Sequence, residues 1–269
     1  SPSEMDLHKK VDGTGEPDSD ARAQDESRIV GMLKDHPNVI KIFTTLSSQN
    51  HVYQVLERCV GDLVDVVKRF GVPSEVLLVR WTYQIVSAVA YAHQLGIVHG
   101  DIKPDNVLLR KDGSIAVSDW GFARDAQNEA SPHCRDFHAT MNYAPPELLQ
   151  GMRGKSREAD AWAVGCLVYG VAYNTLPFGE VKINNPASSA RVCIEPVECK
   201  NDIRKTSMRL KLFVEAAMEK RWRNRKTMKE LLRHPWLAPE ASVYEEMNRI
   251  SMSINTAPLD TSGSKPEHE

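Results

Sequence analysis

The sequence predicts an α+β fold in which strands come first and helices make up most of the chain. Two apolar runs of strand length, residues 39–46 and 52–56, flank the turn-like Ser47-Ser-Gln-Asn50. From residue 74 onward, apolar residues recur at intervals of three and four, which is the period of a helix with one buried face. The longest apolar run, residues 161–173, is too short to cross a bilayer and is typical of a buried helix.

The remaining elements follow from capping and turn residues. Residues 12–25 are polar and rich in turn formers, which predicts a flexible connector, and residues 28–33 have helical spacing. Ser74 is a suitable N-cap for a long helix that should end at Gly96. Residues 220–232 predict another helical stretch.

Polar residues of catalytic type follow two apolar runs. His99-Gly-Asp-Ile-Lys-Pro-Asp-Asn106 follows Gly96-Ile-Val98, and Asp119-Trp-Gly121 follows Ser114-Ile-Ala-Val117. A turn rich in Asp and Asn can arise from loop chemistry alone, and one such turn is common. Two of them at this separation, each directly behind an apolar run, favour a functional site.

Further motifs occur in a fixed order along the chain. They are Thr140-Met-Asn-Tyr-Ala-Pro-Pro-Glu147, Asp160-Ala-Trp-Ala-Val-Gly165, and Arg225 nine residues before His234-Pro-Trp236. Upstream lie His36-Pro-Asn-Val39 and Val52-Tyr-Gln-Val-Leu-Glu-Arg-Cys59. Together with the two turns, these motifs resemble those of protein kinases over roughly residues 5–238, and their shared order makes the resemblance specific.

The resemblance implies a two-lobed kinase fold and a role for each polar residue of the turns. Asp101 would accept the proton of the substrate hydroxyl, and Lys103 would neutralise charge on the moving phosphoryl group. Asn106 and Asp119 would hold Mg²⁺. It also implies a buried ion pair between Glu147 and Arg225.

The resemblance also implies a nucleotide site. Lys9, in Leu7-His-Lys-Lys-Val11, would be the strand lysine, and Glu26 would be its helix partner. The alternative is that Lys9 and Glu26 are two solvated surface charges with no functional role. Around the adenine would lie Leu56 as gatekeeper, Glu57, Cys59, and Leu108 as floor; the two leucines are equally well explained as ordinary core.

The small lobe is expected to be reduced. Only eight residues precede Lys9, too few for the two strands and glycine loop that open a protein kinase, and Gly13-Thr-Gly15 comes after Lys9. A chain cut within the lobe would also explain this. We expect a reduced small lobe at residues 1–57, a large lobe at 58–240, and a polar, partly disordered extension at 241–269.

A missing glycine loop together with a His-Gly-Asp motif resembles the With-No-Gly-loop kinases secreted by apicomplexan parasites, a group that includes a pseudokinase. The resemblance implies a route through dense granules into the parasitophorous vacuole or cyst wall. No signal peptide is visible at Ser1, which suggests a mature fragment.

Composition excludes some partners and leaves others open. With 269 residues, 41% apolar, and a net charge of −2, the chain offers no electrostatic case for nucleic acid or an anionic membrane. A protein substrate or partner is expected instead, of unknown identity. Cys166 is expected to be an inert core thiol, while Cys193 and Cys199 are either a disulfide or two separate thiols.

Two functions fit these observations. The first, which is the preferred interpretation, is a secreted pseudokinase that serves as a binding or structural module in the parasitophorous vacuole or cyst wall; the missing loop favours it. The second is an active Ser/Thr kinase, which the full polar set favours; Lys103 indicates Ser/Thr acceptors by resemblance. Mg-ATP is the implied cofactor, with weak or absent binding because the N–H donors of a glycine loop are lacking.

Overall fold

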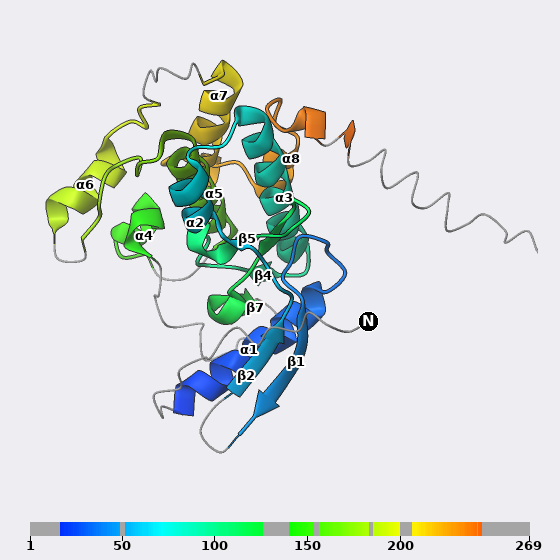
Figure 1. The fold of residues 1–269 in the computed structure, drawn as a ribbon. Helices are drawn as coiled ribbons and strands as arrows, with labels where there is room; N and C mark the ends of the chain where they lie inside the picture. Colours follow the sequence, from blue (N-terminus) through cyan, green and yellow to red (C-terminus); the bar gives the residue numbers. More distant parts are fainter. Residues whose placement is uncertain are drawn as a thin grey trace, which may run out of the picture.

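The computed structural model describes residues 17–48, 52–125, 140–152, 156–182, 185–199, 206–240 and 242–243, and the backbone alone for residues 17–20. Within these ranges Figure 1 shows a small part at one end, built from α1, β1 and β2, and a larger, mainly helical part. The predicted α+β composition is therefore confirmed. The expected strand at Lys9, the missing glycine loop and nearly all of the 241–269 extension lie outside the described residues.

The small part consists of helix α1 (Pro17–Leu33) packed on an antiparallel pair, β1 (Ile42–Ser47) and β2 (Val52–Leu56). Polar contacts join helix and sheet: the buried amide of Gln54 donates to the Ala23 carbonyl at 3.2 Å and to the Ser27 hydroxyl at 3.0 Å. Beside them, the Ser27 and Thr45 hydroxyls lie 2.8 Å apart.

The expectation of a flexible connector is wrong for residues 17–25, because α1 already begins at Pro17. Proline suits the first helical position, since its missing N–H is not needed there. The same residues that looked turn-like in the sequence therefore start a helix.

The large part contains short strands and most of the helices. Its helices are α2 (Leu63–Phe70), α3 (Glu75–Gln94), α4 (Pro146–Leu149), α5 (Arg157–Tyr173), α6 (Pro186–Ile194), α7 (Met208–Ala217) and α8 (Met228–Leu232). Its strands are β3 (Gly61–Asp62), β4 (Ile97–Val98), β5 (Val107–Leu109), β6 (Ile115–Val117) and β7 (Arg124–Asp125). The strands pair antiparallel in the order β3-β5-β6 and, separately, β4-β7.

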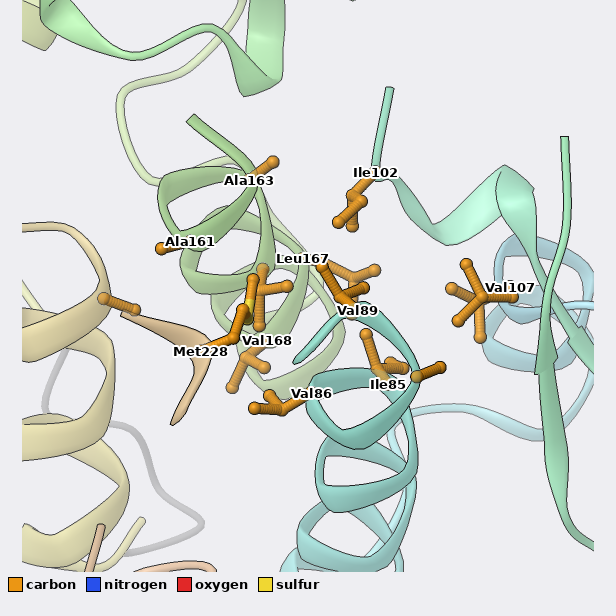
Figure 2. Packing of buried hydrophobic residues seen from close by; sticks show 14 of the residues in the cluster. Ile85, Val86, Val89, Ile102, Val107, Ala161, Ala163, Leu167, Val168 and Met228 are labelled. Carbon is orange, nitrogen blue, oxygen red and sulfur yellow. The ribbon is translucent and has the colours of Figure 1, made fainter. Parts of the chain in front are cut away.

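The core lies between α3 and α5. Figure 2 shows Ile85, Val86 and Val89 of α3 facing Leu167 and Val168 of α5, and all five side chains are buried. As expected, Ser74 caps α3, with its hydroxyl accepting from the Leu77 N–H, and the 161–173 run forms a buried helix. This apolar centre fixes the loops that carry the polar turn residues.

Residues 220–232 depart from the single helical stretch that the sequence suggests. The chain forms a 3-10 turn at Trp222–Asn224, becomes extended at Arg225, and enters helix α8 only at Met228. Thr227 caps α8 in a capping box with Glu230, which fixes the start of the helix. The break lets Arg225 turn inward instead of following a helical surface.

His36 makes stability depend on pH. Its ring lies 3.0 Å from the Ser87 hydroxyl and accepts the Asn38 N–H at 3.1 Å, and burial lowers its pKa from 6.5 to about 4. Between pH 6.5 and about 4, His36 therefore binds a proton in the unfolded chain but stays neutral in the folded chain. This contribution to stability is complete above pH 6.5 and is lost as the pH falls toward 4, by up to about 3 kcal/mol.

Urea unfolding at pH 7.5 and pH 5 checks this expectation. The free energy of unfolding should fall more between the two pH values in the wild type than in His36→Gln, which does not titrate. An equal fall in both proteins would show that His36 is not responsible.

Candidate active site

The polar residues of the first turn converge on one carboxylate. Asp101 follows β4 and accepts hydrogen bonds from the Lys103 ammonium at 2.7 Å and from the Asn106 amide at 3.2 Å. The Thr140 hydroxyl donates to the other carboxylate oxygen at 2.9 Å and itself accepts from Lys103 at 3.1 Å. The structure thus brings Asp101, Lys103 and Asn106 together as the sequence suggests, and adds Thr140.

The charge state of Asp101 follows from these contacts. Burial alone would raise its pKa, but the hydrogen bond and charge of Lys103, with the bond from Thr140, outweigh burial and hold the pKa below its usual value. Asp101 is therefore an anion at neutral pH. It can orient a hydroxyl group and accept its proton.

A second buried carboxylate fixes the backbone that carries Asp101. Asp160, near the start of α5, accepts the N–H groups of His99 at 2.9 Å and Gly100 at 2.8 Å, and lies 2.8 Å from the His93 ring. Burial opposes its ionisation, yet His93 and the other donors keep its pKa low. Gly100 has φ of 77°, a left-handed conformation that glycine adopts without strain.

The two polar turns meet at Asn106 and Asp119. The N–H and hydroxyl of Ser118 both donate to the Asn106 carbonyl, at 2.9 and 3.1 Å, directly before Asp119. Asp119 has φ of 61° and ψ of 61°, a left-handed conformation that is rare for residues other than glycine and is often found at functional sites.

These two residues suit a magnesium ion chemically. The Asn106 side-chain nitrogen donates to the Asp101 carbonyl at 2.8 Å, so its amide oxygen is the atom left for a cation. Mg²⁺ prefers oxygen ligands, and Asp119 supplies a carboxylate. Among the described residues there is no group of three or more His, Cys, Asp or Glu side chains that could hold a metal ion.

Glu26 connects helix α1 to the second turn. Its carboxylate accepts the Trp120 N–H at 3.1 Å. A Cβ placed on Gly121 would lie 3.6 Å from an Asp119 carboxylate oxygen and 3.8 Å from one of Glu26, so both acids border the same glycine. The expected partner Lys9 lies outside the described residues, and the Lys9–Glu26 pair stays a prediction.

Comparison with known proteins agrees with this geometry. The protein kinase domain family matches residues 6–237, which is most of the chain. The chain belongs to the protein kinase family. It is similar to the serine/threonine-protein kinase kin-29 of Caenorhabditis briggsae, with 30% identity over 87% of this chain and 28% of the relative.

Two further relatives are also protein kinases by name. Over 56% of this chain and 33% of the relative, identity is 35% to the 3-phosphoinositide-dependent protein kinase 1 of Arabidopsis thaliana. Over 78% of this chain and 16% of the relative, identity is 31% to the mouse serine/threonine-protein kinase 36. This kinase chain therefore spans about a third or less of the length of these three relatives.

The buried ion pair expected in this kinase is confirmed. Both Glu147 oxygens accept from the Arg225 guanidinium, at 2.7 and 2.9 Å, and the arginine side chain is fully buried. Arg225 also donates to the carbonyls of Glu158 and Glu219, so four of its five N–H groups have a protein acceptor. The pair fastens α4 to the start of α5 and to the segment before α8.

Trp120 fills an apolar slot behind the loop that carries Asp101 in this kinase domain. It is fully buried, its ring centroid lies 4.5 Å from that of His99, and its indole N–H donates to the Val117 carbonyl at 3.1 Å. His99 is fully buried and packs against this ring. The indole hydrogen bond holds the residue after Asp119 in one orientation.

Trp120→Phe should lower the free energy of unfolding by about 1–2 kcal/mol, because a smaller ring leaves a cavity. The Val117 carbonyl still accepts the Ile40 N–H at 2.9 Å, so it keeps a partner. Urea unfolding measures the change, with half-buried Trp222→Phe as the control. No measurable loss, or a loss of more than about 4 kcal/mol, would contradict the cost expected of a small cavity.

The residues expected around the adenine lie on β2, on the segment that follows it, and on β5. Leu56 ends β2, Leu108 lies on β5 opposite Asp62, and both leucines pack on the core cluster. Cys59 is half-buried, and burial raises the pKa of its thiol to about 11. The Val60 N–H donates to the Leu109 carbonyl at 2.7 Å, which ties this segment to β5.

Glu57 has a role that the sequence did not indicate. Its carboxylate accepts two hydrogen bonds from Arg110, both at 2.7 Å, and one from the Lys41 N–H at 2.9 Å. A nucleotide contact by Glu57 would therefore come from its backbone. Arg110 follows β5, and nothing in its sequence neighbourhood marks a partner 53 positions upstream.

Two other expectations concern membrane-spanning helices and the cysteines. None of the helices in the described part of the chain is long and apolar enough to span a membrane. Cys193 and Cys199 are separate free thiols in this structure and form no disulfide. Cys166 is buried in α5, and burial raises the pKa of its thiol.

Proposed function

We propose that the chain is a Ser/Thr protein kinase domain that transfers the γ-phosphoryl group of Mg-ATP to a hydroxyl of a protein. One observation carries the proposal. Asp101 is anionic and is held by Lys103, Asn106 and Thr140, which is the arrangement required to orient a substrate hydroxyl.

Each residue of the network has a defined task in this proposal. Asp101 orients the hydroxyl and receives its proton as the new O–P bond forms and the bond to the leaving ADP oxygen breaks. Lys103, beside Asp101, places positive charge near the moving phosphoryl group. Asn106 and Asp119 would hold Mg²⁺, which neutralises phosphate charge when bound.

The relatives support the Ser/Thr class, because the C. briggsae and mouse proteins are serine/threonine-protein kinases by name. The contacts between helix α1 and the two polar turns also support phosphoryl transfer. Glu26 contacts the backbone of Trp120, and His99 packs on the Trp120 ring, so helix α1 and both turns are already assembled. These contacts place α1 and both turns next to one another, as the proposed transfer requires.

The second candidate is a secreted pseudokinase that binds a protein partner in a parasitophorous vacuole or cyst wall. The His99-Gly-Asp101 motif, which the With-No-Gly-loop group shares, favours it. In this case Mg-ATP binds weakly or not at all, and the kinase fold serves as a binding module. Both the secretory destination and the weak ATP binding remain proposals that rest on the resemblance.

Thermal unfolding with and without Mg-ATP separates the two candidates. A ligand at 100 times its dissociation constant stabilises the folded state by about 2.7 kcal/mol, which raises the melting temperature by several degrees. If the chain is a kinase, the wild type should show this shift and Asp119→Ala should lose it. The control variant Asp105→Ala, which changes the exposed residue before Asn106, should keep the shift. No shift in the wild type would overturn the kinase proposal and support the pseudokinase.

A further inference from the structure

A pocket of about 580 Å³ lies on the mainly helical part, and Asp101 is not among the residues that line it. Its walls come from α4, from Cys193 of α6, and from the loop that carries Lys220 to Asn224. Figure 1 shows α4 and α6 side by side at one end of the helical part, and the two helices are in contact. None of the tasks proposed for Asp101, Asn106 or Asp119 uses this pocket.

The pocket is cationic. Lys220, Arg221 and Arg223 line it, and the carboxylate of Glu147, which also lines it, is fully engaged by Arg225. Arg221 and Arg223 are exposed, and no carboxylate of the described residues pairs with either guanidinium. Two positive groups are therefore available to a ligand at the mouth of the pocket.

The pocket also offers apolar surface. The Arg223 guanidinium lies over the Trp222 ring, 4.4 Å from its centroid, and this stacking holds the cation in place. Met152 lines the pocket and is 48% exposed. A ligand that combines negative charge with an apolar side chain fits this combination, because arginine forks bind carboxylates and the aromatic ring accepts the apolar part.

The chain connects the pocket closely to the catalytic residues. Thr140 bonds Asp101, and Glu147 borders the pocket only seven residues later. Seven extended residues span at most about 25 Å. A substrate chain with its hydroxyl at Asp101 could therefore reach the pocket with a linker of similar length.

We propose that this pocket binds an acidic segment of the protein substrate, within about eight residues of the phosphorylated one. The identification of the ligand as part of a substrate rests on the proposed kinase function. Binding of the acidic segment itself does not depend on catalysis. A carboxylate-rich peptide with one apolar residue is the ligand class.

Fluorescence anisotropy of the full chain with a labelled Glu-Glu-Leu-Glu-Glu peptide tests the proposal directly. At low salt the wild type should bind it, and Arg221→Glu with Arg223→Glu should weaken binding about tenfold. The control is Arg209→Glu with Lys229→Glu, which makes the same charge change at exposed sites outside the pocket and should leave binding unchanged. Equal weakening in the control would overturn the proposal.

Alkylation of the thiols gives a second test that needs no variant. Cys193 lines the pocket, whereas the equally half-buried Cys199 does not. The acidic peptide should slow alkylation of Cys193 alone, as read by mass spectrometry, and a Lys-Lys-Leu-Lys-Lys peptide should have no effect. Equal protection of both thiols, or of neither, contradicts the site, and equal protection by a thymidine oligonucleotide would contradict the peptide class.

Turnover then shows whether bound peptide and catalysis are coupled. For a Ser peptide joined to the acidic segment, the pocket variant should raise KM about tenfold with kcat unchanged. An unchanged KM would overturn the docking role. If the wild type transfers no phosphate at all, the proposed function fails, while the binding and alkylation results still decide whether the pocket takes acidic peptides.

Discussion

Asp101→Asn should lower kcat by about 10²- to 10⁴-fold, because a neutral amide cannot accept the proton of the substrate hydroxyl. Binding of Mg-ATP should persist, since the proposed magnesium ligands Asn106 and Asp119 are intact. Asn can still accept from Lys103 or Thr140, so the loop should keep its shape. Initial rates of phosphoryl transfer, together with the melting temperature, measure both effects.

The matched control for this variant is Asp105→Asn, which removes an exposed carboxylate from the same loop. Its kcat should stay within a factor of about two of the wild type. If both variants lost activity equally, a change in loop charge would explain the result and Asp101 would have no special role.

Glu147→Ala should lower the free energy of unfolding by about 3–5 kcal/mol, because it leaves the Arg225 charge buried without its partner. The arginine side chain is fully buried and the glutamate side chain is 8% exposed, so the pair lies in a poorly hydrated environment where an unpaired charge is costly. Urea unfolding measures the loss. It should appear as a lower midpoint with an unchanged slope.

An exposed pair of the same chain provides the comparison. Glu180 and Lys182 lie 3.4 Å apart with side chains 69% and 65% exposed, so Glu180→Ala should cost less than about 1 kcal/mol. Replacing both buried partners, in Glu147→Leu with Arg225→Met, should cost less than the sum of the single changes. Additive losses would contradict a coupled buried pair.

Much of this fold could be predicted because its determinants are local. Ser74 caps α3 and the 161–173 run is buried because capping side chains and helical periodicity act within a few residues. The residues of the catalytic loop were found for the same reason, since Asp101, Lys103 and Asn106 lie within one short turn. Their shared hydrogen bonds follow from that closeness.

What could not be predicted depends on distant partners. Arg110 meets Glu57 only after β5 folds beside the segment that follows β2, and Thr140 reaches Asp101 across 39 positions. The helical stretch expected at 220–232 is interrupted at Arg225, whose partner Glu147 lies 78 positions upstream, and the Thr227–Glu230 capping box is the local signal that was overlooked. The early start of α1 was missed because Pro and Asp occur equally in turns and in first helical turns.

The most direct measurement of the central claim is transfer of labelled γ-phosphoryl from Mg-ATP to Ser/Thr peptides by the wild-type chain. The peptide should become labelled on serine or threonine in proportion to time and enzyme, and omission of Mg²⁺ should abolish the label. A folded wild type that yields no label at saturating Mg-ATP would contradict the kinase account and leave the pseudokinase as the function.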